Sequence, residues 1–217
     1  MSKVAAIIAV SYMIGAIPFG LIIGYICKGI DIREHGSGNI GASNVLRLVG
    51  WPAALVAFLL DTGKGLVPVV GTGHLTQGYP AIIVCAGLAA IVGHNFSVFL
   101  RFKGGKGVAT SLGVLVGIAP EYAAVGFLLW IVLVAITRYI SLSSIIAGTS
   151  APLLMLIATL DVLPKPFHHY PREFVGLGLA GGLFIVLKHR SNIVRLRNGT
   201  EPKFGKTALE SPAQPKA

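Results

Sequence analysis

The chain has 217 residues, of which 54% are hydrophobic and only 12% are charged. Soluble domains carry about 25% charged residues, so the composition excludes a soluble enzyme, a disordered chain and a fibrous protein. It predicts a protein that lies in lipid. The formal net charge is +10, from 18 Lys and Arg against 8 Asp and Glu. In a membrane protein this excess indicates a membrane surface or an anionic substrate rather than nucleic acid.

Apolar runs recur along the chain, and a helix needs about 20 apolar residues to cross a bilayer. The runs cover 4–27, 51–70, 81–100, 108–119, 122–137, 142–160 and 174–187. The run 108–119 is too short to cross alone and predicts a half-length or tilted helix, and Pro152 predicts a kink in the sixth run. We expect an all-α integral membrane protein with about seven transmembrane helices, some short. Five or six spans follow if the short runs do not cross.

Lysine and arginine positions predict the orientation of these spans, because cytoplasmic loops are enriched in both residues. Alternate loops place 14 of them on one side and 3 on the other, namely Lys3, Lys165 and Arg172. The N-terminus is therefore expected outside and the C-terminus in the cytoplasm. Residues 1–203 are expected to form one transmembrane domain, and the polar, proline-containing stretch 204–217 a disordered tail.

The first polar segment has the sequence GSGNIGASN over 36–44 and is followed by Arg47. Glycines with small polar residues let backbone N–H groups turn toward an anion and form a nest. The planar guanidinium of Arg47 is suited to bind a phosphate there. A plain turn with a helix cap explains the same residues, since Ser and Asn favour both.

The second polar segment runs over 93–110 and places three glycines around Lys106, just before an apolar helix. A helix N-terminus with exposed N–H groups is a ready anion site. The spacing of a nucleotide-binding P-loop is absent. The alternative is a flexible basic loop that touches lipid headgroups.

The third polar segment starts at His189. If this segment is helical, His189, Asn192 and Arg195 share one face. An ordinary basic juxtamembrane helix is the alternative, although it requires neither His189 nor Asn192. Two ionisable residues, Asp61 and Lys64, lie one turn apart within the second span. They predict an ion pair that neutralises itself, or else a pathway through the membrane.

The sequence contains neither a G-x-S-x-G nucleophile motif nor a cluster of His, Cys and carboxylates spaced to bind a metal. The cytoplasmic segments are rich in groups that hold phosphate and poor in acids and bases. This pattern favours a reaction that depends on positioning and charge stabilisation of phosphorylated substrates. A small transporter of an anionic metabolite is the alternative, but a carrier needs a site that both sides can reach. A membrane scaffold protein is a third class, for which the glycine-rich basic loops would be excessive.

The three segments GSGNIGASN with Arg47, GHNFSVFLRFKGGKGVAT and HRSNIVRLRNGTEPK together resemble the bacterial membrane-integral glycerol-3-phosphate acyltransferase family that uses acyl phosphate as donor. The DTGKG stretch at 61–65 and the serines Ser141, Ser143 and Ser144 also fit the family, as does nearly all of the chain up to Lys203. Two departures are Ser43 in place of a common Thr and Ser97 in place of a frequent Pro.

The resemblance implies a seven-helix protein of the bacterial inner membrane, with its active site at the cytoplasmic face. The implied reaction is acyl transfer from acyl phosphate to the 1-hydroxyl of sn-glycerol 3-phosphate, giving lysophosphatidic acid and phosphate, the first step of bacterial phospholipid synthesis. No metal or cofactor is expected. The expected partners are the two substrates, membrane lipid and, functionally, the soluble enzyme that makes acyl phosphate.

The resemblance also assigns residues by position. The pocket for glycerol 3-phosphate would be formed by Ser37, Arg47, Lys106, His189 and Asn192. The acyl-phosphate headgroup would be held by Gly104, Gly105, Gly107 and Ser144. Further substrate contacts are expected from Gly38, Asn39 and Asn44. Of these residues, the ones expected to be catalytic are Ser37, Lys106, His189 and Asn192. Whether His189 or a substrate phosphate oxygen accepts the proton stays open.

Overall fold

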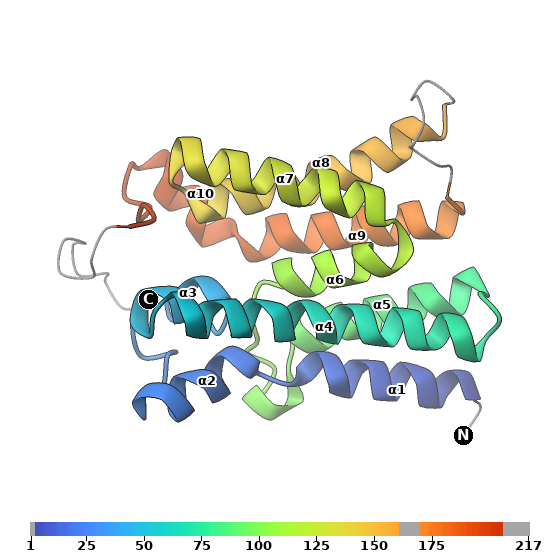
Figure 1. Cartoon of the computed structure of the whole chain (residues 1–217), viewed down its shortest axis with the longest axis horizontal. Helices are drawn as coiled ribbons and strands as arrows, with labels where there is room; N and C mark the ends of the chain where they lie inside the picture. The colour runs from blue at the N-terminus through green and yellow to red at the C-terminus, as the bar shows by residue number, and fades with distance from the viewer. Residues whose placement is uncertain (1–2, 161–169, 206–217) are drawn as a thin grey trace.

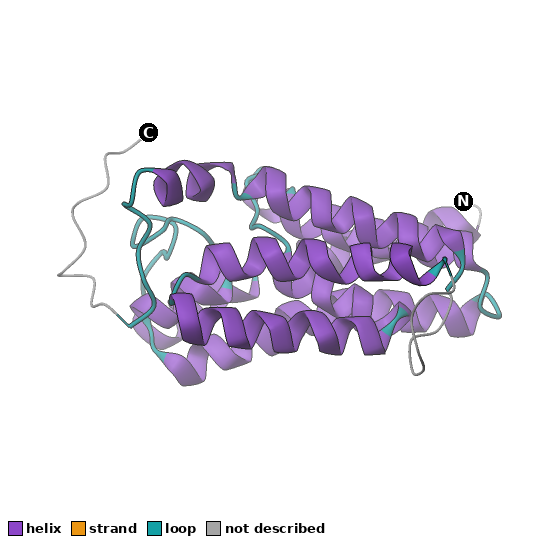
Figure 2. Ribbon diagram, turned by 90° about the horizontal axis from the view of Figure 1, so that it is seen from above, coloured by secondary structure: helices purple, strands orange, loops and turns teal. Residues whose placement is uncertain are grey.

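The computed structural model describes residues 3–160 and 170–205, and within them it contains helices, turns and loops but no β-strand. Figure 1 shows long helices that run side by side along the longest axis of the molecule. Figure 2 shows the same bundle from above, again built only of helices and their connections. The expected all-α fold is confirmed.

Ten α-helices and one short 3-10 helix occur in the described residues. They are α1 (Lys3–Ala16), α2 (Phe19–Lys28), α3 (Ala42–Leu48), α4 (Trp51–Leu75), α5 (Pro80–Asn95), η1 (Val98–Leu100), α6 (Val108–Ile118), α7 (Pro120–Thr137), α8 (Ile140–Ala158), α9 (Arg172–Lys188) and α10 (Arg190–Arg197).

Five helical stretches of the described chain are long and apolar enough to cross a membrane. They are Lys3–Lys28, Trp51–Leu75, Pro80–Leu100, Pro120–Thr137 and Ile140–Ala158. The sixth apolar helix, α6, has only 11 residues and is about 17 Å long at 1.5 Å per residue. The predicted half-length helix is therefore present. Helix α9, which contains the last apolar run, has 17 residues. Helix α8 continues through Pro152, the position of the predicted kink.

The first apolar run is broken, which its composition did not predict. Helix α1 ends at Ala16 and α2 begins at Phe19, with Pro18 between them. Proline has no N–H to continue the hydrogen-bond ladder. Carbonyls at the break accept side-chain hydrogen bonds instead: that of Ala16 from Ser97 Oγ at 2.6 Å, and that of Ile17 from Lys64 Nζ at 2.7 Å. The break thus ties the first run to two other elements.

Glycines bring α4 and α6 into backbone contact. A Cβ atom on Gly65 would overlap the carbonyl oxygen of Thr110, and one on Gly113 would overlap that of Thr62. Small residues at such interfaces let transmembrane helices approach closely. This packing fixes the start of α6, and hence the loop before it, against the middle of α4.

The bundle has one end at which short polar elements gather. Helices α2, α3 and α10 lie at the left of Figure 1, together with the C-terminal ends of α7 and α9. The first residues of α1 and the turn between α4 and α5 lie at the opposite end. Of the expected polar tail, only 204–205 lie within the described residues. Phe204 and Arg138 exchange two hydrogen bonds there.

Gly65→Ala is expected to lower the melting temperature of the detergent-purified protein by several degrees, because overpacking costs about 1–3 kcal/mol. Gly63 lies on the same helix, and a Cβ there meets no atom within 4 Å. Gly63→Ala should leave the melting temperature unchanged or raise it, since alanine favours helix over glycine. Equal shifts in the two variants would contradict the close contact between α4 and α6.

Candidate active site

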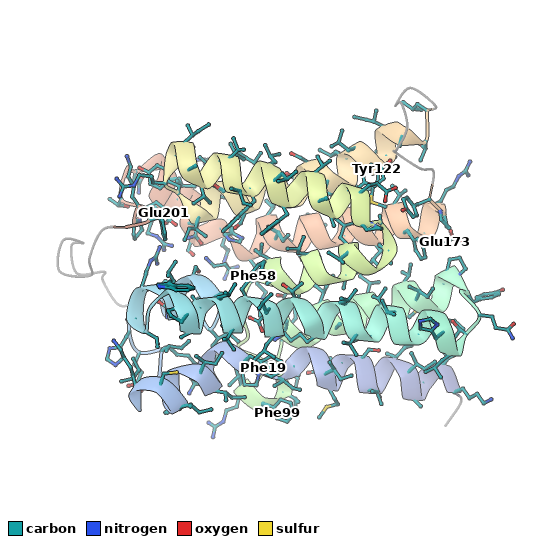
Figure 3. The ribbon with its side chains drawn as sticks, in the orientation of Figure 1. Phe19, Phe58, Phe99, Tyr122, Glu173 and Glu201 are labelled. Atoms are coloured by element: carbon teal, nitrogen blue, oxygen red, sulfur yellow. The ribbon has the colours of Figure 1, made fainter. Side chains whose placement is uncertain are left out.

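A cavity of about 500 Å³ opens among helices α3 to α10. Lys106, just before α6, and Ile118, its last residue, both line the cavity. The cavity therefore extends along all of α6. Its wall is polar beside α3 and α10 and apolar farther along α7 and α8, for example at Ala123 and Ala151. Figure 3 labels Glu201 near α10, at the polar end. The arrangement suits a ligand with a polar head and an apolar tail.

Glu201 is the centre of a hydrogen-bond network at the polar end. Its Oε1 accepts hydrogen bonds from Ser141 Oγ and Asn192 Nδ2, each at 2.6 Å, and its Oε2 accepts one from Arg195 Nε at 2.8 Å. Burial alone would raise the pKa of Glu201, but these three donors lower it below its ordinary value. Glu201 is therefore a carboxylate that joins α8 to α10.

Lys106 reaches the same network through Asn192. Its Nζ donates to Asn192 Oδ1 at 2.5 Å. Burial lowers the pKa of Lys106 to about 8, Glu201 opposes this shift, and Arg195 and Arg47 add to it. Within the described residues, Glu201 forms its salt bridge with Arg195, and neither Lys106 nor Arg47 has one. Two cations at the polar end thus remain available to a bound anion.

His189 lies between α9 and α10 and lines the cavity. Its Nδ1 is 2.8 Å from the carbonyl oxygen of Ile185. A carbonyl oxygen only accepts hydrogen bonds, so this contact assigns the proton to Nδ1 and leaves Nε2 as the acceptor in the neutral ring. Burial and the charge of Lys106 lower the pKa of His189 to about 4. The ring is therefore neutral near pH 7.

The segment before α3 lines the cavity with Ser37 and Asn39 but not with Gly38, and α3 itself lines it with Arg47 but not with Asn44. Asn44 is fully buried. Its Oδ1 accepts from the backbone N–H of Ser37 at 2.9 Å, and its Nδ2 donates to the carbonyl of Ile32 at 2.7 Å. The expected substrate contact from Asn44 is thus not present in this geometry, because its amide holds the loop that carries Ser37. Gly38 forms part of the same turn and has a positive φ of 66°.

Only part of the glycine-rich segment lines the cavity. Gly107 lines the cavity, whereas Gly104 and Gly105 do not. Both pack against His94, whose carbonyl accepts the N–H of Gly105 at 3.0 Å. Direct contacts from Gly104 and Gly105 to a headgroup are therefore not supported by their position.

Ser144, on α8, does line the cavity. Its Oγ donates to the carbonyl of Ile140 at 2.8 Å and accepts from Trp130 Nε1 at 3.1 Å. The structure thus brings Ser144 together with Ser37, Arg47, Lys106, His189 and Asn192, which come from widely separated parts of the sequence.

Sequence reasoning missed the part that Glu201 plays. A signal was present, because Glu201 is the only acidic residue between Lys188 and Lys206. An isolated acid within a basic segment indicates a specific partner. Asp61 and His94 also line the cavity, although the sequence placed Asp61 only within a span.

Comparisons of the sequence and of the structure with known proteins indicate the same family. Residues 5–199 match the family model described as glycerol-3-phosphate acyltransferase. The glycerol-3-phosphate acyltransferase of Desulforudis audaxviator is 45% identical over 206 residues, which is 94% of this chain and 98% of the relative. That of Geobacter sulfurreducens is 45% identical over 196 residues, or 90% of this chain and 95% of the relative.

A solved structure supports the same family. It is a crystal structure of PlsY, an integral membrane glycerol 3-phosphate acyltransferase, in its glycerol 3-phosphate form. It is 37% identical to this chain, matches 94% of this chain and 96% of its own, and has a TM-score of 0.85. These matches and the apolar helices identify the chain as an integral membrane protein of the glycerol-3-phosphate acyltransferase family.

Proposed function

We propose that the chain transfers an acyl group from acyl phosphate to the 1-hydroxyl of sn-glycerol 3-phosphate. The products are lysophosphatidic acid and inorganic phosphate, and the reaction is the first step of bacterial phospholipid synthesis. Family membership makes the chain an acyltransferase that acts on glycerol 3-phosphate. One observation supports the donor: Arg47 and Lys106, which form no salt bridge within the described residues, lie at the polar end of a cavity whose wall along α7 and α8 is largely apolar. A phosphate joined to an acyl chain fits both parts.

The polar residues then have distinct roles. Arg47 and Lys106 bind the phosphates, because charged hydrogen bonds to phosphate are the strongest that side chains form. Asn192, held by Glu201, keeps its Oδ1 toward Lys106. Ser37 and His189 are placed to contact the glycerol moiety. Ser144 and the backbone of Gly107, which also line the cavity, would contact the donor headgroup.

The proton passes to a phosphate oxygen of a substrate rather than to His189. The glycerol O1 attacks the acyl carbonyl carbon, the bond from that carbon to the phosphate oxygen breaks, and phosphate leaves while a phosphate oxygen takes the hydroxyl proton. A general base works best with a pKa near the working pH. The pKa of His189 is lowered to about 4, whereas the second pKa of a phosphate monoester is about 6.

We further propose seven spans, with the N-terminus outside, the C-terminus in the cytoplasm and the active site at the cytoplasmic face of the inner membrane. Support comes from the gathering of α2, α3 and α10, with the basic residues that they carry, at one end of the bundle. A site on that side would receive acyl phosphate from the soluble enzyme that makes it.

The topology is tested with single cysteines in a background that lacks Cys27 and Cys85. A membrane-impermeant thiol reagent added to intact cells should label His74→Cys, at the end of α4, and spare Arg197→Cys, at the end of α10. Both positions are exposed. After lysis both variants should react. Labelling of Arg197→Cys in intact cells would overturn the proposed orientation.

The reaction is tested with purified protein in detergent, acyl phosphate and glycerol 3-phosphate. We expect equimolar release of phosphate and lysophosphatidic acid, with acyl-CoA unused as donor. Lys106→Ala should abolish most turnover, whereas Lys103→Ala, at an exposed position of the same loop that does not line the cavity, should retain it. A protein that binds glycerol 3-phosphate but releases no phosphate would favour the transporter alternative. Equal rates with acyl-CoA would contradict the proposed donor.

The lowered pKa of Lys106 predicts an alkaline limb in the pH profile. In the free enzyme Lys106 loses its charge as the pH rises through about 8, so kcat/KM for glycerol 3-phosphate should fall about tenfold per pH unit above that value. Arginine stays charged throughout this range. Lys106→Arg should therefore be less active at neutral pH but show no limb near 8. An unchanged limb in Lys106→Arg would assign it to another group.

A further inference from the structure

The last two residues of α5 lie directly beneath the glycine-rich loop. Gly105 N–H donates to the carbonyl of His94 at 3.0 Å. A Cβ on Gly105 would overlap the Nε2 of the His94 ring, and one on Gly107 would lie 2.7 Å from Asn95 Oδ1. The loop therefore rests on the side chains of His94 and Asn95, and its path depends on where those side chains stand.

The other side of the His94 ring faces a buried ion pair on α4. Lys64 Nζ lies 2.8 Å from Asp61 Oδ1, and the same oxygen is 3.9 Å from His94 Nδ1. All three side chains are almost completely buried. The ion pair expected from the sequence is thus present, but Lys64 also donates to the carbonyl of Ile17. Asp61 consequently faces two neighbours, an ammonium group and an imidazole.

The His94 ring is held by packing, and its polar contact is with Asp61. Its Nδ1 has no hydrogen-bond partner among the described residues, so the carboxylate of Asp61 is the polar group that attracts an Nδ1–H. This tautomer directs the Nε2 lone pair toward Gly105, the residue before Lys106. Lys188 Nζ donates to the carbonyl of Asn95 at 2.9 Å and Ser97 Oγ donates to that of Ala16. These two bonds fix the main chain on both sides of the turn, but not the imidazole.

We propose that His94, oriented by Asp61, is a positioning residue that supports the loop at Gly105 and so aims the ammonium group of Lys106 into the polar end of the cavity. The inference rests on the proposed role of Lys106 in binding phosphate. His94 is not assigned a chemical role, and its Nε2 lies against Gly105. Its effect on the reaction passes through Lys106.

A misplaced positioning contact can reduce catalysis by roughly 100-fold. In His94→Ala we expect kcat/KM for glycerol 3-phosphate to fall roughly 10- to 100-fold, chiefly through a higher KM. His94→Gln keeps a polar group against Gly105 and should restore most of the loss. Partial unfolding would instead lower the apparent kcat and leave KM unchanged, so the division between KM and kcat separates positioning from stability.

Asp61 is tested by changing both members of its ion pair, because a single change would leave an unpaired buried charge. The double variant Asp61→Asn, Lys64→Met should raise KM in the same direction as His94→Ala. Thr72→Ala is the matched control, since Thr72 is buried on the same helix α4 but does not line the cavity. The control should keep the KM of the unmodified enzyme.

Amide hydrogen exchange supplies a readout that does not depend on activity. A peptide covering residues 101–107 should exchange faster in His94→Ala than in Thr72→Ala or the unmodified protein, because the Gly105 hydrogen bond loosens. If the unmodified protein lacked transferase activity, the proposed function would fail while this comparison still tested the contact. An unchanged KM, or unchanged exchange, in His94→Ala would overturn the positioning role. An unchanged KM in the double variant would overturn the part assigned to Asp61.

Discussion

The carboxylate of Glu201 is the interaction on which the polar pocket depends. It accepts three hydrogen bonds and pairs with Arg195. One carboxylate cannot neutralise three nearby cations, and within the part of the chain that the structure describes Arg47 and Lys106 form no salt bridge. Glu201 also keeps Asn192 in place, so the network both assembles the pocket and sets its charge. A pocket that neutralised every cation internally would be more stable and would bind phosphate poorly.

The second constraint comes from the bilayer, in which every backbone polar group needs a partner. Between α5 and α6 the chain forms only the short helix η1, yet several of its N–H groups find partners within the segment or at the end of α5. Phe102 N–H donates to the carbonyl of Ser97, Lys103 N–H to that of Leu100, and Gly105 N–H to that of His94. These bonds stabilise the polar loop between the end of α5 and the start of α6. Lys106 lies at the end of this loop and lines the cavity.

Local patterns in the sequence predicted much of this architecture. The apolar runs became helices, the short run 108–119 became α6, and His189, Asn192 and Arg195 gathered at α10. The break at Pro18 was not predicted, because hydropathy measures apolar content and the residues around this proline are apolar. The place of Asn44 and the partner of Glu201 were also missed. These depend on contacts 12 and 60 residues away along the chain, which no local spacing encodes.

The electrostatics of the pocket explain why so few acids and bases suffice for acyl transfer. Burial and neighbouring cations lower the pKa values of both Lys106 and His189, which is the signature of a partly dry, positive site. Such a site disfavours a protonated imidazole and therefore disfavours His189 as the proton acceptor. It strengthens the attraction of fixed cations for phosphate, since charge interactions grow as the dielectric falls. The proposed donor, an acyl phosphate, is already activated for transfer, so in the proposed reaction the protein needs to supply only position and positive charge, and the leaving phosphate carries away the proton.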